Sequence, residues 1–152
     1  MITEELESII RFMSDRHKLK VYRNRLDKKI IKPCVFYPIP KIESKYLSSS
    51  EYRNDYIWCI RFYDGVDKKV DKSIYDTVIS IYTDIVENKN LIPIYYKEEL
   101  TEDSITIQKV EIEELKNEVI VLRLHWTSFY QYERDTVDKI EKFNFDSDIK
   151  DN

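Results

Sequence analysis

The chain contains a single glycine, Gly65, among its 152 residues. Phosphate-binding loops, dinucleotide fingerprints and nucleophile elbows all depend on glycine, because their backbone must turn sharply or approach a ligand closely. The sequence therefore excludes these common enzyme sites. Gly65 stands between an apolar run and a helical pattern, so we expect Asp64-Gly65 to turn the chain from a strand into a helix.

The composition indicates one globular domain with an acidic surface. The chain is 42% hydrophobic and 36% charged, and a chain of this length can bury about 68–70% of its unfolded surface. We expect a single domain over residues 1–145 and a frayed acidic tail over residues 146–152. The net charge of −4 and pI of about 5.3 disfavour sequence-specific nucleic-acid binding, for which a strongly basic domain is typical. The locally basic segment His17–Lys32 is interpreted as a solvated strand face.

The two cysteines, Cys34 and Cys59, are too few and too far apart to predict a disulfide framework or a zinc site. Both lie in apolar runs, where free cysteine packs as a small hydrophobic residue. The acidic N-terminus does not resemble a signal peptide, and no apolar run reaches the ~20 residues of a membrane span. These features favour the cytoplasm and predict no membrane contact.

A first amphipathic helix is expected from Thr3 to about Asp15. Thr3 is a suitable N-cap, and the glutamates after it favour the positive end of the helix dipole. Apolar residues recur at spacings of three and four, so this helix should dock on a sheet. A further short helix is expected over Arg134–Phe145.

The main helix is expected over residues 67–88, where apolar residues fall on a single face. Asp67 can cap its start, and Asn88 or Asn90 can end it in a left-handed conformation. A helix with one apolar face covers one side of a sheet, so we expect it to pack there.

Strands are predicted at six places: Leu19–Leu26, Ile30–Ile39, Asp55–Tyr63, Leu91–Tyr96, Ser104–Ile112 and Glu118–Tyr132. Asp55–Tyr63 is apolar on both faces and should be central. Pro33 and Pro38 place the second strand at an edge or end it early, and Pro93 does the same for Leu91–Tyr96. The remaining segment, Pro40–Asn54, has little periodicity and is interpreted as a long loop.

The last two strands should form a hairpin whose second arm is long. At ~3.3 Å per residue it would span about 45–50 Å, so part of it is expected to project or to join a neighbouring chain. Together these elements predict an α+β fold. Its sheet is mixed and mainly antiparallel, with about four to six strands, the 67–88 helix on one face and a short N-terminal helix.

No catalytic residue, metal site or cofactor is predicted. His125 beside Trp126 could form part of an enzyme or ligand site, but a histidine in a strand is more commonly structural. The acidic residues of two clusters are interpreted as solvated or helix-capping groups, with a hard cation as the alternative for the second. The first cluster is Glu111, Glu113 and Glu114; the second is Asp64, Asp67 and Asp71.

The order of elements resembles the tail terminator proteins of long-tailed bacteriophages and phage-like particles. A short helix precedes strands carrying "LKVYRNRLDKKIIKPCVFYPIP"; the strand "YIWCIRFYD", the helix "SIYDTVISIYTDIVEN" and a strand ending "VIVLRLHWTSFYQYER" follow. The resemblance runs from Thr3 to about Arg134 and rests on element order and size. It implies a hexameric ring that caps the completed tail tube and presents the surface for joining the head.

The resemblance also implies partners: copies of the chain itself, the tail tube protein, the sheath protein of a contractile tail, and the head–tail connector. The location would be the neck of the virion, after assembly in the host cytoplasm. Ring interfaces often use tyrosine, and the chain has 12. The candidate interface residues are Tyr46, Tyr52, Tyr95, Tyr96, Tyr130 and Tyr132. The alternatives are another neck component, such as a head-completion or stopper protein, or a small intracellular enzyme or ligand-binding domain.

Overall fold

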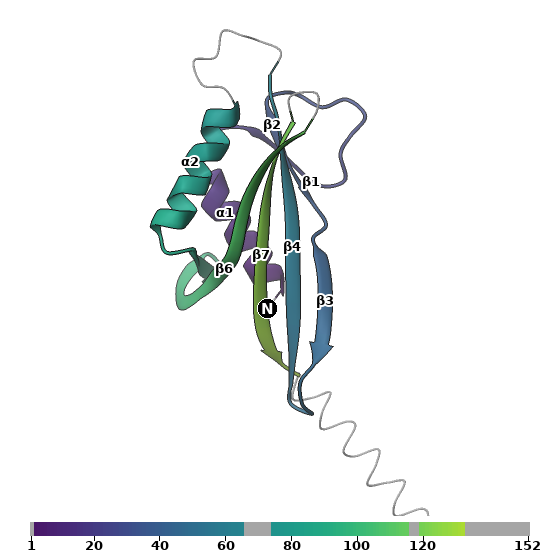
Figure 1. Cartoon of the computed structure of the whole chain (residues 1–152), viewed down its shortest axis with the longest axis vertical. Helices are drawn as coiled ribbons and strands as arrows, with labels where there is room; N and C mark the ends of the chain where they lie inside the picture. The colour runs from purple at the N-terminus through teal and green to yellow at the C-terminus, as the bar shows by residue number, and fades with distance from the viewer. Residues whose placement is uncertain (1, 66–73, 116–118, 133–152) are drawn as a thin grey trace, which may run out of the picture.

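The computed structural model describes residues 2–65, 74–115 and 119–132, which form an α+β fold of two helices and one curled sheet of seven strands (Figure 1). In chain order the elements are α1 (Ile2–Ser14), β1 (Lys20–Asn24), β2 (Cys34–Pro38), β3 (Lys41–Tyr46), β4 (Glu51–Tyr63), α2 (Ile74–Glu87), β5 (Leu91–Tyr96), β6 (Glu99–Leu115) and β7 (Val119–Gln131). The predicted fold class is confirmed. The sheet is mixed, because β1 and β2 are parallel while the other strand pairs are antiparallel.

Strands β4 and β7 form the centre of the sheet. They pair without a register shift from Glu51 opposite Gln131 to Tyr63 opposite Val119. The described strands follow the order β1-β2-β4-β7-β6-β5, and β3 pairs with β4 beside β2. The predicted central strand and the predicted C-terminal hairpin are therefore both confirmed.

The prediction of a loop over Pro40–Asn54 was wrong. Lys41–Tyr46 forms β3, which pairs with the Tyr52–Ile57 part of β4 in an antiparallel hairpin. In its turn the Ser48 hydroxyl accepts hydrogen bonds from the amides of Ser50 and Glu51. All six residues of β3 are exposed. Because neither face of the strand is buried, its sequence shows no alternation of apolar and polar residues, and the segment is a strand only through its backbone pairing with β4.

Strand β2 lies between β1 and β4, so the prediction of an edge position was wrong, while that of an early end is confirmed. Pro33 precedes the strand and Pro38 is its last residue, where a missing amide costs little. The carbonyl of Pro38 accepts a hydrogen bond from Trp58 Nε1 at 2.6 Å. Pro93 lies on β5, which ends the strand order as expected.

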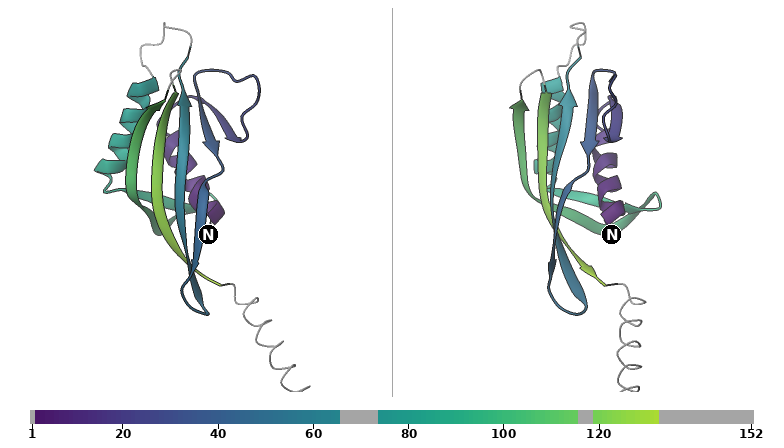
Figure 2. Two further views of the ribbon diagram at one scale, coloured as in Figure 1. Left: turned by 45° about the vertical axis from the view of Figure 1, so that its right-hand side comes forward. Right: turned by 90° about the vertical axis from the view of Figure 1, so that its right-hand side faces the viewer.

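Both helices pack on the concave side of the sheet and share one hydrophobic core with it (Figure 2). α1 contributes Ile9, Phe12 and Met13, and its bounds agree with the prediction to within one residue. α2 contributes a stripe of four buried residues, Ile74, Val78, Ile81 and Ile85. Burying an aliphatic or aromatic side chain of this size contributes about 1.5–3 kcal/mol, so this core holds both helices on the sheet.

The chain makes its tight turns without glycine. α2 ends through Lys89 and Asn90, both with positive φ, as was predicted for Asn90. Lys97-Glu98 turn β5 into β6 with φ of 48° and 66°. Gly65 does not use its conformational freedom, because its φ is not positive. A Cβ there would lie 3.1 Å from Pro33 Cδ, so the glycine permits close packing against Pro33.

Several predictions lie outside the described residues. These are the start of the main helix at Asp67, the short helix Arg134–Phe145 and the acidic tail over residues 146–152. No helix in the described ranges is long and apolar enough to cross a membrane.

His17 provides a test of the packing between α1 and the sheet. Its Nδ1 accepts a hydrogen bond from the Leu19 amide at 3.1 Å, and its ring meets Phe62 edge-on. Its Nε2 is buried without a partner among the described residues. Burial lowers the pKa of His17 below its ordinary value of 6.5, because the charged form loses hydration.

We expect His17→Gln to reduce the loss of stability on acidification. With a depressed folded-state pKa, the stabilisation from neutral His17 is complete above pH 6.5 and is lost as the pH falls toward the folded-state pKa. Urea unfolding between about pH 7 and about pH 5 should therefore show a steeper loss in wild type than in the variant. Parallel curves for the two proteins would show that His17 does not cause this dependence.

Candidate interaction site

Four of the six predicted tyrosines meet at one end of the sheet. In register, Tyr46 of β3 lies opposite Tyr52 of β4, which lies opposite Tyr130 of β7. The Tyr52 ring is 5.3 Å from that of Tyr130 and 5.1 Å from that of Tyr132. We call Tyr46, Tyr52, Tyr130 and Tyr132 the tyrosine cluster. These distances are typical of favourable aromatic pairs, so the rings of Tyr52, Tyr130 and Tyr132 pack together, and Tyr46 extends this surface onto β3 through its register with Tyr52.

This end of the sheet extends beyond the helices (Figures 1 and 2). Tyr46 is 72% exposed, and its neighbours Leu47 and Ile42 are also exposed. The same face of the sheet is buried further along, where Tyr56 stacks on Trp126 at 4.7 Å. The core face thus continues into solvent as an exposed apolar surface, and such surfaces mark interaction sites.

A buried polar network anchors the cluster to α1. Glu5 of α1 is 5% exposed, and its carboxylate accepts hydrogen bonds from the hydroxyls of Ser128 and Tyr130. The Tyr130 and Tyr56 hydroxyls are hydrogen-bonded to each other at 2.6 Å. From there the network continues through Asn54 to Ser44 of β3. It therefore joins α1 to all three strands that carry the cluster.

The environment keeps the network tyrosines neutral. Desolvation by burial raises the pKa of Tyr130 far above its ordinary value of 10.0, and the neighbouring Glu5 carboxylate raises it further. Burial also raises the pKa of Tyr56. Both phenols remain hydrogen-bond donors across the physiological pH range. The network can therefore hold the strands of the tyrosine cluster in a fixed position.

Tyr95 and Tyr96 are not part of the cluster. The Tyr95 ring lies 3.8 Å below the Arg11 guanidinium, and its amide donates to Ser8 Oγ of α1 at 2.9 Å. Tyr96 is exposed at the β5–β6 hairpin beside Lys97. The structure therefore separates these two candidates from the other four and uses Tyr95 to seat β5 on α1.

His125 and Trp126 point to opposite faces of β7. Trp126 is buried in the core on the concave face. On the convex face, His125 Nε2 lies 3.0 Å from Glu111 Oε1. Arg123 pairs with Glu113 at 2.9 Å on the same face. The structure thus does not bring His125 and Trp126 into one site, and His125 belongs to a ladder of polar cross-strand pairs.

The described parts of the two acidic clusters contain no ligand set for a cation. No group of three or more histidine, cysteine or acidic residues suited to a metal occurs within residues 2–65, 74–115 and 119–132. Asp64 Oδ1 accepts a hydrogen bond from the Gly65 amide, while Asp67 and Asp71 lie outside the described residues. Cys34 is buried and Cys59 half-buried, and both are free thiols.

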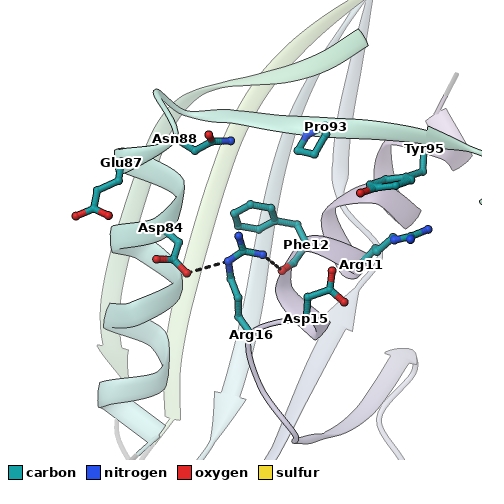
Figure 3. A pocket seen from close by; sticks show the side chains of 9 residues that line it. All are labelled: Arg11, Phe12, Asp15, Arg16, Asp84, Glu87, Asn88, Pro93 and Tyr95. Carbon is teal, nitrogen blue, oxygen red and sulfur yellow. Dashed lines mark hydrogen bonds and ion pairs between the residues drawn. The ribbon is translucent and has the colours of Figure 1, made fainter. Parts of the chain in front are cut away.

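An open groove of about 490 Å³ lies between α1, α2 and β5 (Figure 3). Arg16, two residues after the end of α1, spans it, donating from Nε to Asp84 of α2 at 2.9 Å and from Nη1 to the Phe12 carbonyl of α1 at 2.7 Å. Its guanidinium also lies 3.6 Å from the Phe12 ring centroid. These contacts join the two helices, and we assign the groove no ligand.

Sequence analysis missed Glu5 as a site residue. It lies four positions before Ile9, on the apolar stripe of α1, where an acidic residue is unusual. That position is the signal that could have found it, because a carboxylate on a buried face needs hydrogen-bond donors. Ser128 and Asn54 gave no comparable signal, since polar residues are common at strand ends.

We expect Tyr130→Phe to lower the free energy of unfolding by about 1–3 kcal/mol, because it leaves the buried Glu5 carboxylate with one donor fewer. Tyr52→Phe is the matched control: its ring packs in the same cluster, and its hydroxyl forms no hydrogen bond with any residue that the structure describes. The control should change stability by less than about 0.5 kcal/mol. Urea denaturation of both variants measures the difference, and equal losses would show that the Glu5 network does not stabilise the fold.

Comparison with known proteins gives one informative similarity. No protein-family model matches the chain. The chain is 24% identical over 153 residues to the uncharacterized protein YqbJ of Bacillus subtilis (strain 168), and the match covers 98% of this chain and 100% of YqbJ. Nearly the whole chain, including the strands of the tyrosine cluster, therefore has a counterpart in a protein of similar length.

Proposed function

We propose that the chain is a structural assembly protein: a ring-forming tail terminator that caps a completed tail tube and provides the surface for joining the head. The observation that carries the proposal is the tyrosine cluster, an aromatic surface at the end of the sheet that extends beyond the helices, in which Tyr46 is 72% exposed and the other three tyrosines are half-buried. The order of elements, which resembles that of tail terminators, supports the same function. The role requires no catalysis and no cofactor.

The cluster has the physical properties that an assembly interface needs. Tyrosine has an apolar ring and a polar hydroxyl, so it is stable in water before assembly and in a buried contact afterwards. The Glu5 network already fixes Tyr130, so binding would lose less side-chain entropy there. A closed ring also requires two different complementary surfaces on each subunit, and the cluster would supply one of them.

The partners in this proposal are further copies of the chain, the tail tube protein, the connector and, in a contractile particle, the sheath protein. The chain would act at the neck of the virion. A head-completion or stopper protein of the same neck is the second candidate, because it would need the same kind of exposed aromatic surface. His125 and Trp126 do not support the enzyme alternative, because these residues lie on opposite faces of β7 and cannot form one site.

We expect deletion of the gene to produce tubes of irregular length that fail to join heads, in a strain that makes the particles. Supplying the wild-type chain should restore uniform tails, and Tyr46→Ala should not, because it removes the most exposed ring of the cluster. Phe129→Ala is the matched control: Phe129 is 67% exposed near the same end but on the convex face. Electron microscopy measures tail length and head joining for each strain.

Two results would contradict the proposal. Deletion with unchanged tail length and head joining excludes a terminator, and equal defects from Tyr46→Ala and Phe129→Ala exclude a specific role for the cluster. His125→Ala should leave both properties intact, because His125 lies on the convex face of β7 and outside the tyrosine cluster. Purified protein should form a species of six times the 18.5 kDa chain mass, either directly or from a monomer.

A further inference from the structure

Two strand edges on opposite sides of the sheet have no partner among the described residues. β3 pairs only with β4, so its outer edge from Lys41 to Tyr46 is free. β6 lies between β7 and β5, but β5 pairs only with its first part, Glu99–Thr106. The outer edge of β6 from Lys109 to Leu115 is therefore free as well. Unpaired edges offer backbone donors and acceptors to another strand.

The directions of these two edges favour pairing between copies related by rotation. β3 runs antiparallel to β4, β4 to β7, and β7 to β6; consequently β3 and β6 are antiparallel. Rotation about an axis roughly along the strands preserves each direction, so β3 of one copy meets β6 of the next in antiparallel orientation. β3 lies beside the Tyr52–Ile57 half of β4. The free part of β6 lies beside the half of β7 that pairs with Ile57–Tyr63, so the two edges are offset along the strand direction. The strands of a closed ring would thus be inclined to its axis, as in barrels.

The charges of the two edges are complementary. β3 carries two lysines and one glutamate, Lys41, Glu43 and Lys45. The free part of β6 carries one lysine and three glutamates, Lys109, Glu111, Glu113 and Glu114. A net positive edge would therefore meet a net negative one, and opposite charges across a strand pair are favourable.

α2 offers an apolar surface beside the free edge of β6. Tyr75, Ile79 and Val86 are 49%, 36% and 46% exposed and recur at helical spacing. At about 100° per residue they lie on the side of α2 opposite Asp84, and Asp84 faces α1 through its ion pair with Arg16. The stripe therefore faces away from α1. The concave-facing side chains of an added β3, Ile42 and Tyr46, are themselves exposed and would cover it.

The outer edges of β1 and β5, the two strands that end the strand order, are less suited to pairing. β5 contains Pro93, which cannot donate to a ladder. β1 carries Lys20 and Arg23, and the connection to β2 lies beside it, where the Ile31 amide donates to Tyr22 Oη (Figure 2). Charged residues and a covering loop are common protections of a sheet edge.

We propose that β3 of one copy adds antiparallel to the Lys109–Leu115 edge of β6 of the next copy, so that the ring is held by a sheet continuous across its subunits. Ile42 and Tyr46 of the first copy pack on Tyr75, Ile79 and Val86 of the second. This inference rests on the proposed ring and names its main subunit contact.

Cysteine cross-linking between separately purified variants tests this contact. Glu43→Cys protein is mixed with Lys109→Cys, Glu111→Cys or Glu113→Cys protein, all in a Cys59→Ser background, and is oxidised at the highest soluble concentration. At least one mixture should give a cross-linked species at twice the 18.5 kDa chain mass, and neither variant alone should. Lys20→Cys, on β1, replaces Glu43→Cys as the matched control and should give none. Melting temperatures verify that every variant is folded.

Three results would overturn the inference. These are a ring-sized species without cross-links at any of the three positions, a chain that remains monomeric, and cross-linking of Glu43→Cys with itself. The last result would mean a twofold dimer through β3. The assay uses purified chain and needs no particle. Cross-links as expected together with normal tails on gene deletion would refute the proposed function alone, whereas a ring without these cross-links would refute this contact alone.

Discussion

The unshifted pairing of β4 with β7 determines most of the structure. Along its length, alternate residues of both strands face the concave side, where they build the core at one end and the tyrosine cluster at the other. β2 and β3 attach to the free side of β4, and β6 attaches to β7. A slip of one residue would turn every inward side chain outward. Core packing and the candidate interface are therefore fixed by the same register.

The concave face changes from core to surface at Glu5. Beyond this residue neither of the two described helices covers the strands, and the large apolar side chains of the core give way to tyrosines. A carboxylate at this boundary would be costly without partners, but Ser128 and Tyr130 both donate to it. The network therefore ends the core and at the same time holds Tyr130, the half-buried tyrosine nearest the core, in place. Tyr130 therefore contributes both to the stability of the fold and to the proposed interface.

The sequence predicts elements that bury a periodic face. The helical stripe of α1, the two-sided apolar pattern of β4 and the long second arm of the hairpin were all recognisable. β3 was not, because every one of its residues is exposed and its strand conformation depends on a partner distant in space. The position of β2 depended on whether its prolines stood inside the strand or at its ends, which periodicity does not show.

The candidate site was predicted in part for the same reason. Tyrosine content pointed to an interface, but the grouping of four tyrosines and the separation of Tyr95 and Tyr96 depend on strand register. Glu5 and the exposed stripe on α2 are visible only as departures from simple amphipathic helices: a charge within an apolar stripe, and a second stripe beside the buried one. Residues that depart from the simple amphipathic pattern in this way are the ones from which a functional surface can be predicted.

Two free edges on one sheet create an aggregation risk, since either could recruit any extended chain. The alternation of charged side chains along β3 and free β6 reduces that risk for the isolated subunit, because burying a charge without a partner is costly. In the proposed ring each edge receives an edge of the opposite net charge, so the same residues that oppose random pairing favour the correct one. The scarcity of glycine fits this arrangement: turns built from Asn, Lys and Glu restrict the backbone more than glycine would. Two of these turns lie at the end of α2 and between β5 and β6, so they help to fix the path of the chain into β6, which carries one of the two edges.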